Sequence, residues 1–163
     1  MRVILVRHAI AVERGTGWAD AERPLTLEGV QRLEKSVAGM ARAGLSLDRL
    51  LTSPWTRAVE TAERVAELLV QGAPIETELL ADEPTEALLE ALATGESVGA
   101  VGHEPWMSEL CAWLCTGDPE LASVFPFKKA GVAVLEGEAP RPGEMELKAF
   151  LPPRMLRRLA PQR

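Results

Sequence analysis

Arg7 and His8 stand side by side at the end of an apolar segment, and their residue types suggest phosphate chemistry. Residues 3–6, just before them, are all apolar and mostly β-branched, a pattern typical of a strand buried on both faces. Such a strand delivers its last side chains to the sheet edge where open α/β folds bind ligands. There a guanidinium can bind an anion beside an imidazole nucleophile. The pair alone fits a strand ending in solvated polar residues equally well.

Two other segments place a similar side chain after an apolar stretch. The second of only two histidines, His103, follows the apolar residues 98–102. Arg57 follows another apolar stretch and the pair Ser53-Pro54. Serine is a good helix cap and proline suits the first helical position, so a helix is predicted to begin there. Arg57 would then lie in its first turn, near the positive end of the helix dipole.

Strands and helices are predicted to alternate, which favours a largely parallel sheet. Helical spacing of apolar residues predicts helices over residues 27–43, 54–70, 85–93 and 106–115. Short β-type stretches predict further strands over residues 75–78, 132–135 and 144–150. We therefore expect a three-layer α/β/α sandwich with a mostly parallel central sheet, formed by one domain of residues 1–163. Because parallel strands end at the same edge, four groups are expected to converge into a phosphate pocket: Arg7, His8, Arg57 and His103.

Composition limits the classes of partner. The 163 residues are 47% hydrophobic, enough for one core, and carry a net charge of −6. This negative charge disfavours nonspecific binding to nucleic acid. It also means that an anionic substrate must be attracted by a local basic pocket, because the overall field of the protein would repel it. No apolar run approaches the ~20 residues needed to cross a bilayer. Because Arg7 and His8 interrupt the first apolar stretch too early for a signal peptide, we expect a cytoplasmic protein without membrane partners.

Cys111 and Cys115 are the only cysteines. They do not form a Cys-x-x-Cys pair, and neither histidine has the spacing that would complete a zinc site. Two small side chains on a buried helix face explain them better. We expect no metal site and no cofactor.

Four segments together resemble the motifs of the histidine phosphatase superfamily, in the same order. They are residues 7–9 (Arg-His-Ala, where the family has Arg-His-Gly), 23–29, 53–61 and 101–105. The resemblance covers residues 1 to about 115 and is greatest to the compact, SixA-type phosphohistidine phosphatases. The fold is expected to lack the large helical insertion of other members, which leaves the pocket open. Ala9 and Glu60, where many members have glycine and glutamine, remove no catalytic group.

The resemblance implies a metal-independent phosphatase. His8 would attack phosphorus and form a phosphohistidine intermediate, while Arg7 and Arg57 would bind the phosphoryl oxygens. His103, if protonated, would supply another donor and a further positive charge. Two residues could add phosphate or substrate contacts. These residues are Arg23 and Ser53. An exposed salt bridge would explain Arg23 equally well, and capping of the predicted helix would explain Ser53 equally well.

The general acid is not identified by the sequence. Glu83 and Glu104 are the main candidates, and three more carboxylates lie in nearby loops: Glu13, Asp20 and Asp82. Each fits an ordinary surface carboxylate better. A phosphoramidate leaves as an imidazole, which needs less help from an acid than an alkoxide does. The missing acid therefore favours an N-phosphorylated substrate.

The expected substrate is phosphohistidine on a signalling protein, for example a histidine-containing phosphotransfer domain. The main alternatives are a phosphatase or mutase acting on small phosphorylated molecules, and a non-catalytic module that recognises phosphate. A mutase must hold a bisphosphate and exclude water, which an open pocket does not favour.

Overall fold

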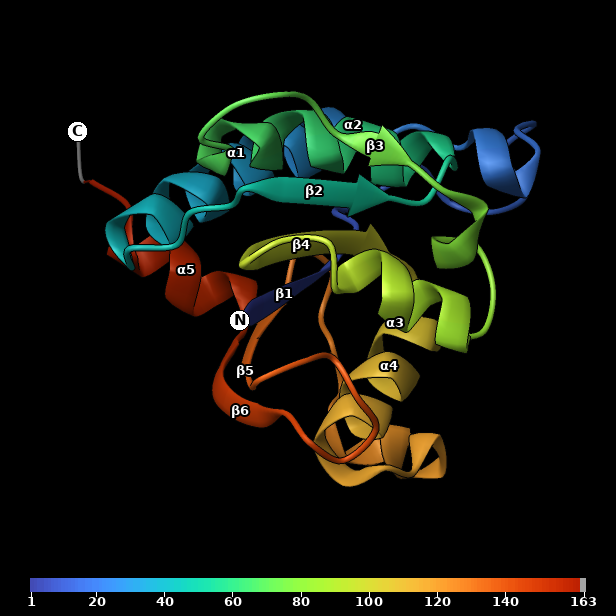
Figure 1. Cartoon of the computed structure of the whole chain (residues 1–163). Helices are drawn as coiled ribbons and strands as arrows, with labels where there is room; N and C mark the ends of the chain where they lie inside the picture. The colour runs from blue at the N-terminus through green and yellow to red at the C-terminus, as the bar shows by residue number, and fades with distance from the viewer. Residues whose placement is uncertain (162–163) are drawn as a thin grey trace.

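The structure, a computed structural model, describes residues 1–161, and its centre is a six-stranded sheet (Figure 1). The strands are β1 (Arg2–Arg7), β2 (Arg49–Thr52), β3 (Ile75–Glu76), β4 (Ser97–Gly102), β5 (Val132–Glu136) and β6 (Glu146–Leu151). Their order across the sheet is β3-β2-β4-β1-β5-β6. Residues 162 and 163 of the predicted domain lie outside the described part.

The pairing of the central strands decides where side chains can meet. β1 pairs with β4 in parallel, with Arg7 opposite Gly102, and β2 also runs parallel to β4. β5 runs antiparallel to both β1 and β6. The ends of β1, β2 and β4 therefore reach the same edge, and the predicted mostly parallel sheet is confirmed.

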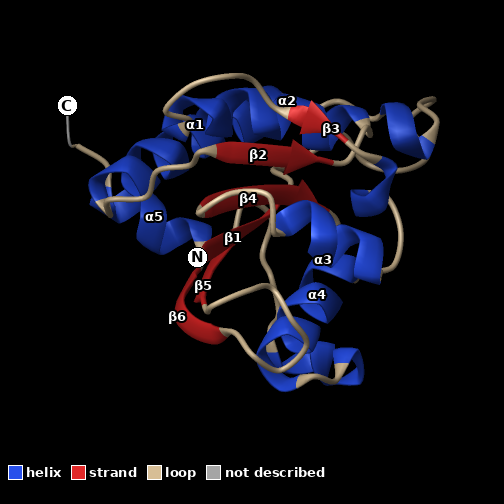
Figure 2. Cartoon of the chain, in the orientation of Figure 1, coloured by secondary structure: helices blue, strands red, loops and turns tan. Residues whose placement is uncertain are grey.

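Helices cover both faces of the sheet (Figure 2). They are α1 (Leu27–Arg42), α2 (Thr56–Val65), α3 (Glu86–Leu92), α4 (Trp106–Thr116) and α5 (Pro153–Leu159). Short 3-10 helices span Asp20–Glu22, Ala66–Leu68, Glu78–Leu80 and Pro119–Val124. Alternate residues of β1 serve the two cores: Val3 and Leu5 pack with α3 and α4, whereas Ile4 and Val6 pack with α1, α2 and α5. This is the expected three-layer sandwich.

The first helix follows its local sequence signals closely. Thr26 caps α1 by accepting a hydrogen bond from the backbone of Gly29 at 2.9 Å. After the helix, Gly44 adopts a positive φ of 77°, a conformation that glycine tolerates well. The predicted span of residues 27–43 is correct to within one residue.

The second helix was predicted wrongly at both ends. It begins at Thr56, and its N-cap position is Trp55, which offers no side-chain cap. The hydroxyl of Ser53 instead accepts from the backbone NH of Trp55 at 3.3 Å and lies against His103. The helix then ends at Val65 and continues as a 3-10 turn. Ser53 therefore does not cap α2, and its hydroxyl contacts the distant residue His103.

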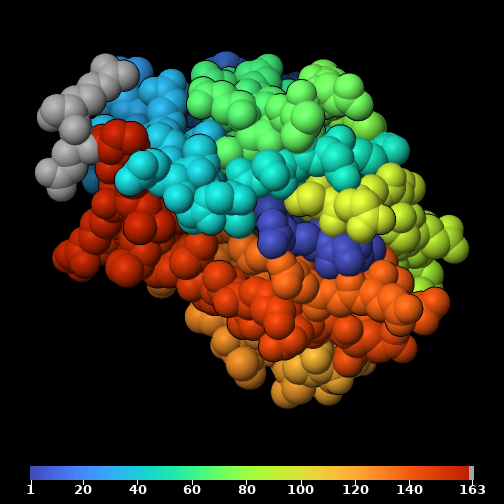
Figure 3. All heavy atoms as spheres, turned by 60° about the vertical axis from the view of Figure 1, so that its left-hand side comes forward, coloured from blue at the N-terminus to red at the C-terminus, as the bar shows by residue number. Residues whose placement is uncertain are grey.

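Helix α5, which packs against α1, was not predicted from the sequence. Gly39 permits this contact, because a Cβ there would lie 1.9 Å from the carbonyl oxygen of Leu156. Figure 3 shows the two segments together on the surface, the C-terminal one in red and α1 in light blue. Among the described residues, no helix has the length and apolar character required to span a membrane.

Candidate active site

His8 is the first residue after β1 and is held by the backbone around it. Its NH donates to the carbonyl of Gly102 at 3.0 Å, which ties the ends of β1 and β4 together. The imidazole is 6% exposed, and its Nδ1 lies 2.7 Å from the carbonyl oxygen of Ala9. A carbonyl can only accept, so Nδ1 carries the hydrogen. The lone pair of a neutral His8 is therefore on Nε2.

Arg57 lies directly beside that lone pair. Its Nε is 3.3 Å from Nε2 of His8, and its Nη1 donates to the carbonyl oxygen of Asp20 at 2.6 Å. The guanidinium carbon also lies 4.7 Å from the centre of the Trp55 ring. With 2% of Arg57 exposed, the cation is held next to the imidazole by contacts from three directions.

Thr61 connects the end of β1 to α2, a role that the sequence analysis missed. Its hydroxyl donates to the carbonyl of Arg57 at 2.7 Å and accepts from the NH of Ala9 at 3.1 Å. Next to it, Glu60 accepts from the NH of Leu25 at 2.6 Å. The only sequence signal was that both residues lie in the same motif as Arg57.

His103 approaches the same place from the end of β4. Its ring centre is 5.2 Å from that of His8 and 4.6 Å from that of Trp55, while Trp106 meets it edge-on at 6.3 Å. Nε2 of His103 is 2.8 Å from the hydroxyl of Ser53. Its Nδ1 is buried and has no hydrogen-bond partner within residues 1–161.

Arg7 also keeps part of its hydrogen-bonding capacity unused. Its Nη1 donates to the carbonyl oxygen of Phe127 at 2.7 Å. Its Nε is buried without a partner in the described part of the chain. Buried polar atoms are rarely left unpaired in native proteins. Arg7 thus retains an N–H that could donate to an oxyanion. His103 can donate from Nδ1 as well, in the tautomer in which its Nε2 accepts from the Ser53 hydroxyl.

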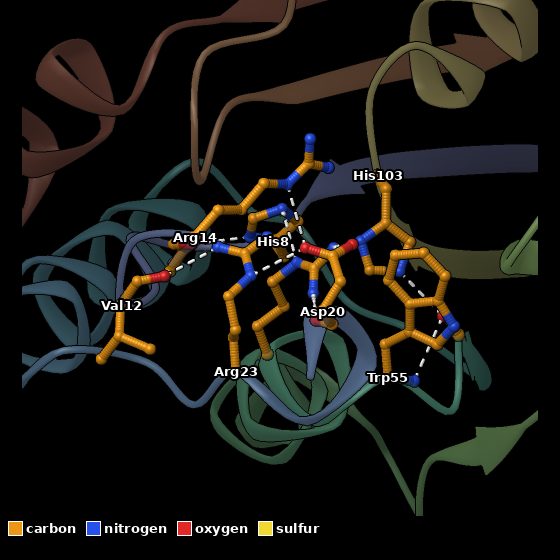
Figure 4. A network of polar contacts seen from close by, with 10 residues as sticks. His8, Val12, Arg14, Asp20, Arg23, Trp55 and His103 are labelled. Carbon is orange, nitrogen blue, oxygen red and sulfur yellow. Dashed lines mark hydrogen bonds and ion pairs between the residues drawn. The ribbon is translucent and has the colours of Figure 1, made fainter. Parts of the chain in front are cut away.

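Asp20 organises the arginines around the pocket (Figure 4). Its carboxylate accepts from Arg14 at 3.0 Å and from Arg23 at 2.9 Å, and lies 3.6 Å from Nη2 of Arg57. Although burial opposes ionisation, the Arg14 hydrogen bond and the charges of Arg57 and Arg23 lower the pKa of Asp20. Arg23, 9% exposed, also donates to the carbonyl of Val12. Arg23 therefore forms a salt bridge, which was one of the two alternatives, but with its guanidinium largely buried and with Asp20 as the partner.

Both imidazoles are neutral near pH 7. Burial is the main cause that lowers the pKa of His8 to about 2, against the opposing effect of the Ala9 hydrogen bond. Burial and then the charge of Arg57 lower the pKa of His103 to about 3. The neutral state of His8 is the one that a nucleophile requires, whereas His103 lacks the protonated state that would supply a further charge. Burial lowers the pKa of Arg57 only to about 10, so it stays charged.

The two main candidates for the general acid lie in different surroundings. Glu104 follows His103, but its two carboxylate oxygens lie 2.8 and 2.7 Å from the hydroxyl of Ser108, which can donate its one hydrogen to either. Burial raises the pKa of Glu104. Glu83 is exposed; burial of Glu109 and, after it, the charge of Glu83 raise the pKa of Glu109. Within residues 1–161 neither Glu83 nor Glu104 forms a hydrogen bond or ion pair with the four pocket groups.

The cysteines take no part in this pocket. Cys111 is buried on α4 and Cys115 is half-buried one turn later, and both are free thiols. Within the described chain, no group of three or more histidine, cysteine, aspartate or glutamate residues is arranged to hold a metal ion.

Comparisons with known proteins point in one direction. The model of the histidine phosphatase superfamily (branch 1) matches residues 3–83. An uncharacterised protein of Picosynechococcus sp. is 32% identical over 86% of this chain and 88% of its own length. The phosphohistidine phosphatase SixA of Escherichia coli is 30% identical over 72% of this chain and 76% of its own. A solved structure of the protein histidine phosphatase SixA with tungstate has a TM-score of 0.78 at 25% identity, covering 96% of this chain and 99% of that one.

Proposed function

The chain belongs to the histidine phosphatase superfamily, and we propose that it dephosphorylates phosphohistidine on a signalling protein, with His8 as nucleophile. The observation that carries this proposal is the contact between Nε of Arg57 and Nε2 of His8, with Nδ1 of His8 bound to a carbonyl. It leaves a neutral nitrogen lone pair beside a fixed positive charge.

In the first step, the Nε2 lone pair of His8 forms a bond to phosphorus while the bond from phosphorus to the substrate nitrogen breaks. That electron pair leaves with the substrate imidazole, which takes up a proton from solvent water. Arg57 then donates to a phosphoryl oxygen in place of Nε2, and Arg7 adds a second guanidinium. Fixed positive groups of this kind stabilise charge that develops on transferring phosphoryl oxygens.

In the second step, water attacks the phosphorus of phospho-His8. The bond between phosphorus and Nε2 breaks, its electrons return to the imidazole, and inorganic phosphate leaves after the water has lost a proton. The guanidinium groups supply the positive charge throughout, so the proposed reaction requires neither a metal nor a cofactor. His103 contributes Nδ1, which is buried and unpaired in the described residues, as a partner for a phosphoryl oxygen.

Two observations support an N-phosphorylated substrate. Neither Glu83 nor Glu104 bonds to the pocket groups within the described chain, and an imidazole leaving group depends less on an acid than an alkoxide does. The similarity to SixA, named a phosphohistidine phosphatase, points the same way. The similar structure of the protein histidine phosphatase SixA was solved with tungstate. Tungstate is a tetrahedral oxyanion, like the phosphate that we propose to bind in this pocket.

The test is to add a histidine-containing phosphotransfer domain that carries radiolabelled phosphate and to trap label on the enzyme. We expect label on the wild type and none on His8→Ala, together with release of inorganic phosphate by the wild type alone. Sugar phosphates and an aryl phosphate serve as competing substrates. Turnover confined to those esters would replace the protein substrate with a small molecule, and phosphate binding without any turnover would indicate a recognition module.

A further inference from the structure

A groove of about 460 Å³ opens next to the candidate active site, on the side covered by α1 and α5. Arg7 and Ala9, which flank His8 in sequence, both line it. The groove continues past the loop that leads into β5 and reaches the first turn of α5. A molecule bound there would lie beside the two residues that flank His8 in the chain.

The groove is strongly basic, although the protein as a whole is acidic. Six cations line it and no acidic residue does: Arg7, Arg32, Lys128, Lys129, Arg154 and Arg157. Only Arg32 forms an ion pair, with Glu28 at 2.5 Å; within residues 1–161 the other five have no carboxylate partner. Since the chain has 18 lysines and arginines and a net charge of −6, one third of its cations gather in this groove.

Apolar side chains form the floor between these charges. Leu33 of α1, Ile10, and the pair Pro152-Pro153 before and at the start of α5 all line the groove. Lys128, Lys129 and Arg154 are exposed. A surface with an apolar centre and an unpaired cationic rim is complementary to a chain that alternates apolar and acidic side chains.

We propose that this groove binds an acidic segment of the phosphoprotein substrate, next to its phosphorylated residue. The inference deepens the proposed function and depends on it only for the identity of the substrate. A long nucleic acid fits less well, because the negative charge elsewhere on the protein would repel the parts that extend beyond the groove. A short acidic segment meets only the groove itself.

The first experiment measures the binding of an unphosphorylated peptide to the full chain. The probe is a short fluorescein-labelled peptide rich in glutamate with a few leucines, and its partner peptide has glutamine in place of glutamate. Lys129→Glu/Arg154→Glu should weaken binding of the acidic peptide about tenfold, since exposed ion pairs are individually modest. The matched control is Arg141→Glu/Arg158→Glu, which changes the net charge equally at exposed residues outside the groove; it should bind like wild type.

The second experiment measures kcat/KM. With a phosphorylated phosphotransfer domain, the groove variant should lose about tenfold, mainly through KM, while hydrolysis of an aryl phosphate stays unchanged. Equal losses on both substrates, equal binding of the two peptides, or equally strong binding of a single-stranded oligonucleotide would overturn the groove proposal. If no phosphoprotein is a substrate, the proposed function fails, while the peptide measurement still decides whether the groove binds an acidic segment.

Discussion

The candidate active site and the basic groove lie side by side and use the same residue types in opposite ways. Arg57 and Arg23 of the active site are at most 9% exposed, and both bond to Asp20. Lys129 and Arg154 of the groove are exposed and make no ion pair in the described chain. Burial and fixed geometry suit charge stabilisation in a transition state, whereas exposed flexible cations suit recognition and the rate of encounter.

Substitutions in the active site and in the groove should therefore change different kinetic constants, and by different amounts. Removing a buried, hydrogen-bonded group should reduce kcat strongly on every substrate. Removing an exposed cation should change KM, and only for substrates that reach it.

The largest effect is expected from His8→Ala. Without Nε2 no bond to phosphorus can form, so kcat should fall more than about a hundredfold on phosphoprotein and aryl phosphate alike. The unfolding transition, followed by circular dichroism, should remain cooperative. Activity above about one hundredth of wild type in a folded variant would remove His8 from its assigned role.

Arg57→Ala should lower kcat by about 10²–10³, the usual loss when one preorganised donor to a developing anion is removed. Arg57→Lys keeps the charge but loses the planar fork that reaches both His8 and Asp20, so it should recover only part of the activity. Arg64→Ala, on the same helix but paired with Glu63, is the matched control and should resemble wild type. Unchanged turnover of Arg57→Ala at saturating substrate would exclude Arg57 from the pocket.

The buried histidines should make stability depend on pH. Their folded pKa values of about 2 and about 3 lie below the ordinary 6.5, so the unfolded chain binds more protons once the pH falls below 6.5. Their stabilising contribution is therefore complete above that pH and is lost progressively as the pH falls towards 3. Between pH 7 and pH 5, each histidine should cost about 2 kcal/mol of unfolding free energy.

Urea unfolding at the two pH values measures this loss. His8→Ala should show a smaller loss than wild type, by about the contribution of one histidine. Glu104, whose pKa is raised by burial, changes stability with the opposite sign and is present in both proteins, so the comparison cancels it. An identical pH dependence of the two proteins would contradict the buried, neutral state of His8.

The smallest effect is expected from salt. Raising ionic strength from about 0.05 M to about 0.5 M shortens the range of charge interactions severalfold, mainly between exposed groups. The kcat/KM for a phosphorylated phosphotransfer domain should fall severalfold, and that for an aryl phosphate should change much less. Lys129→Glu/Arg154→Glu should already lack most of the salt dependence. A salt dependence that this variant retains in full would place the attraction outside the groove.

Local patterns in the sequence were enough to predict much of the scaffold. Residues 3–6 and 98–102 are apolar throughout, and they form the adjacent strands β1 and β4. Thr26 caps α1 as expected. From these strands followed the meeting of His8 and His103, whose ring centres are 5.2 Å apart. Strand burial, helix capping and the shared edge of parallel strands are encoded by residues close together in the chain.

Other features depended on contacts between distant residues, which local patterns do not encode. Ser53 was predicted to cap a helix, yet its hydroxyl contacts His103, fifty positions away. Asp20, one of several loop carboxylates in the sequence, became the partner of Arg57. The seven residues of α5 carry too little pattern to predict a helix, and only packing on α1 at Gly39 completes the wall of the basic groove. Residue types and their spacing were sufficient to identify the groups that could do the chemistry. Which of these groups are buried, paired and neutral depends on the complete fold, because burial and pairing arise from contacts between distant residues.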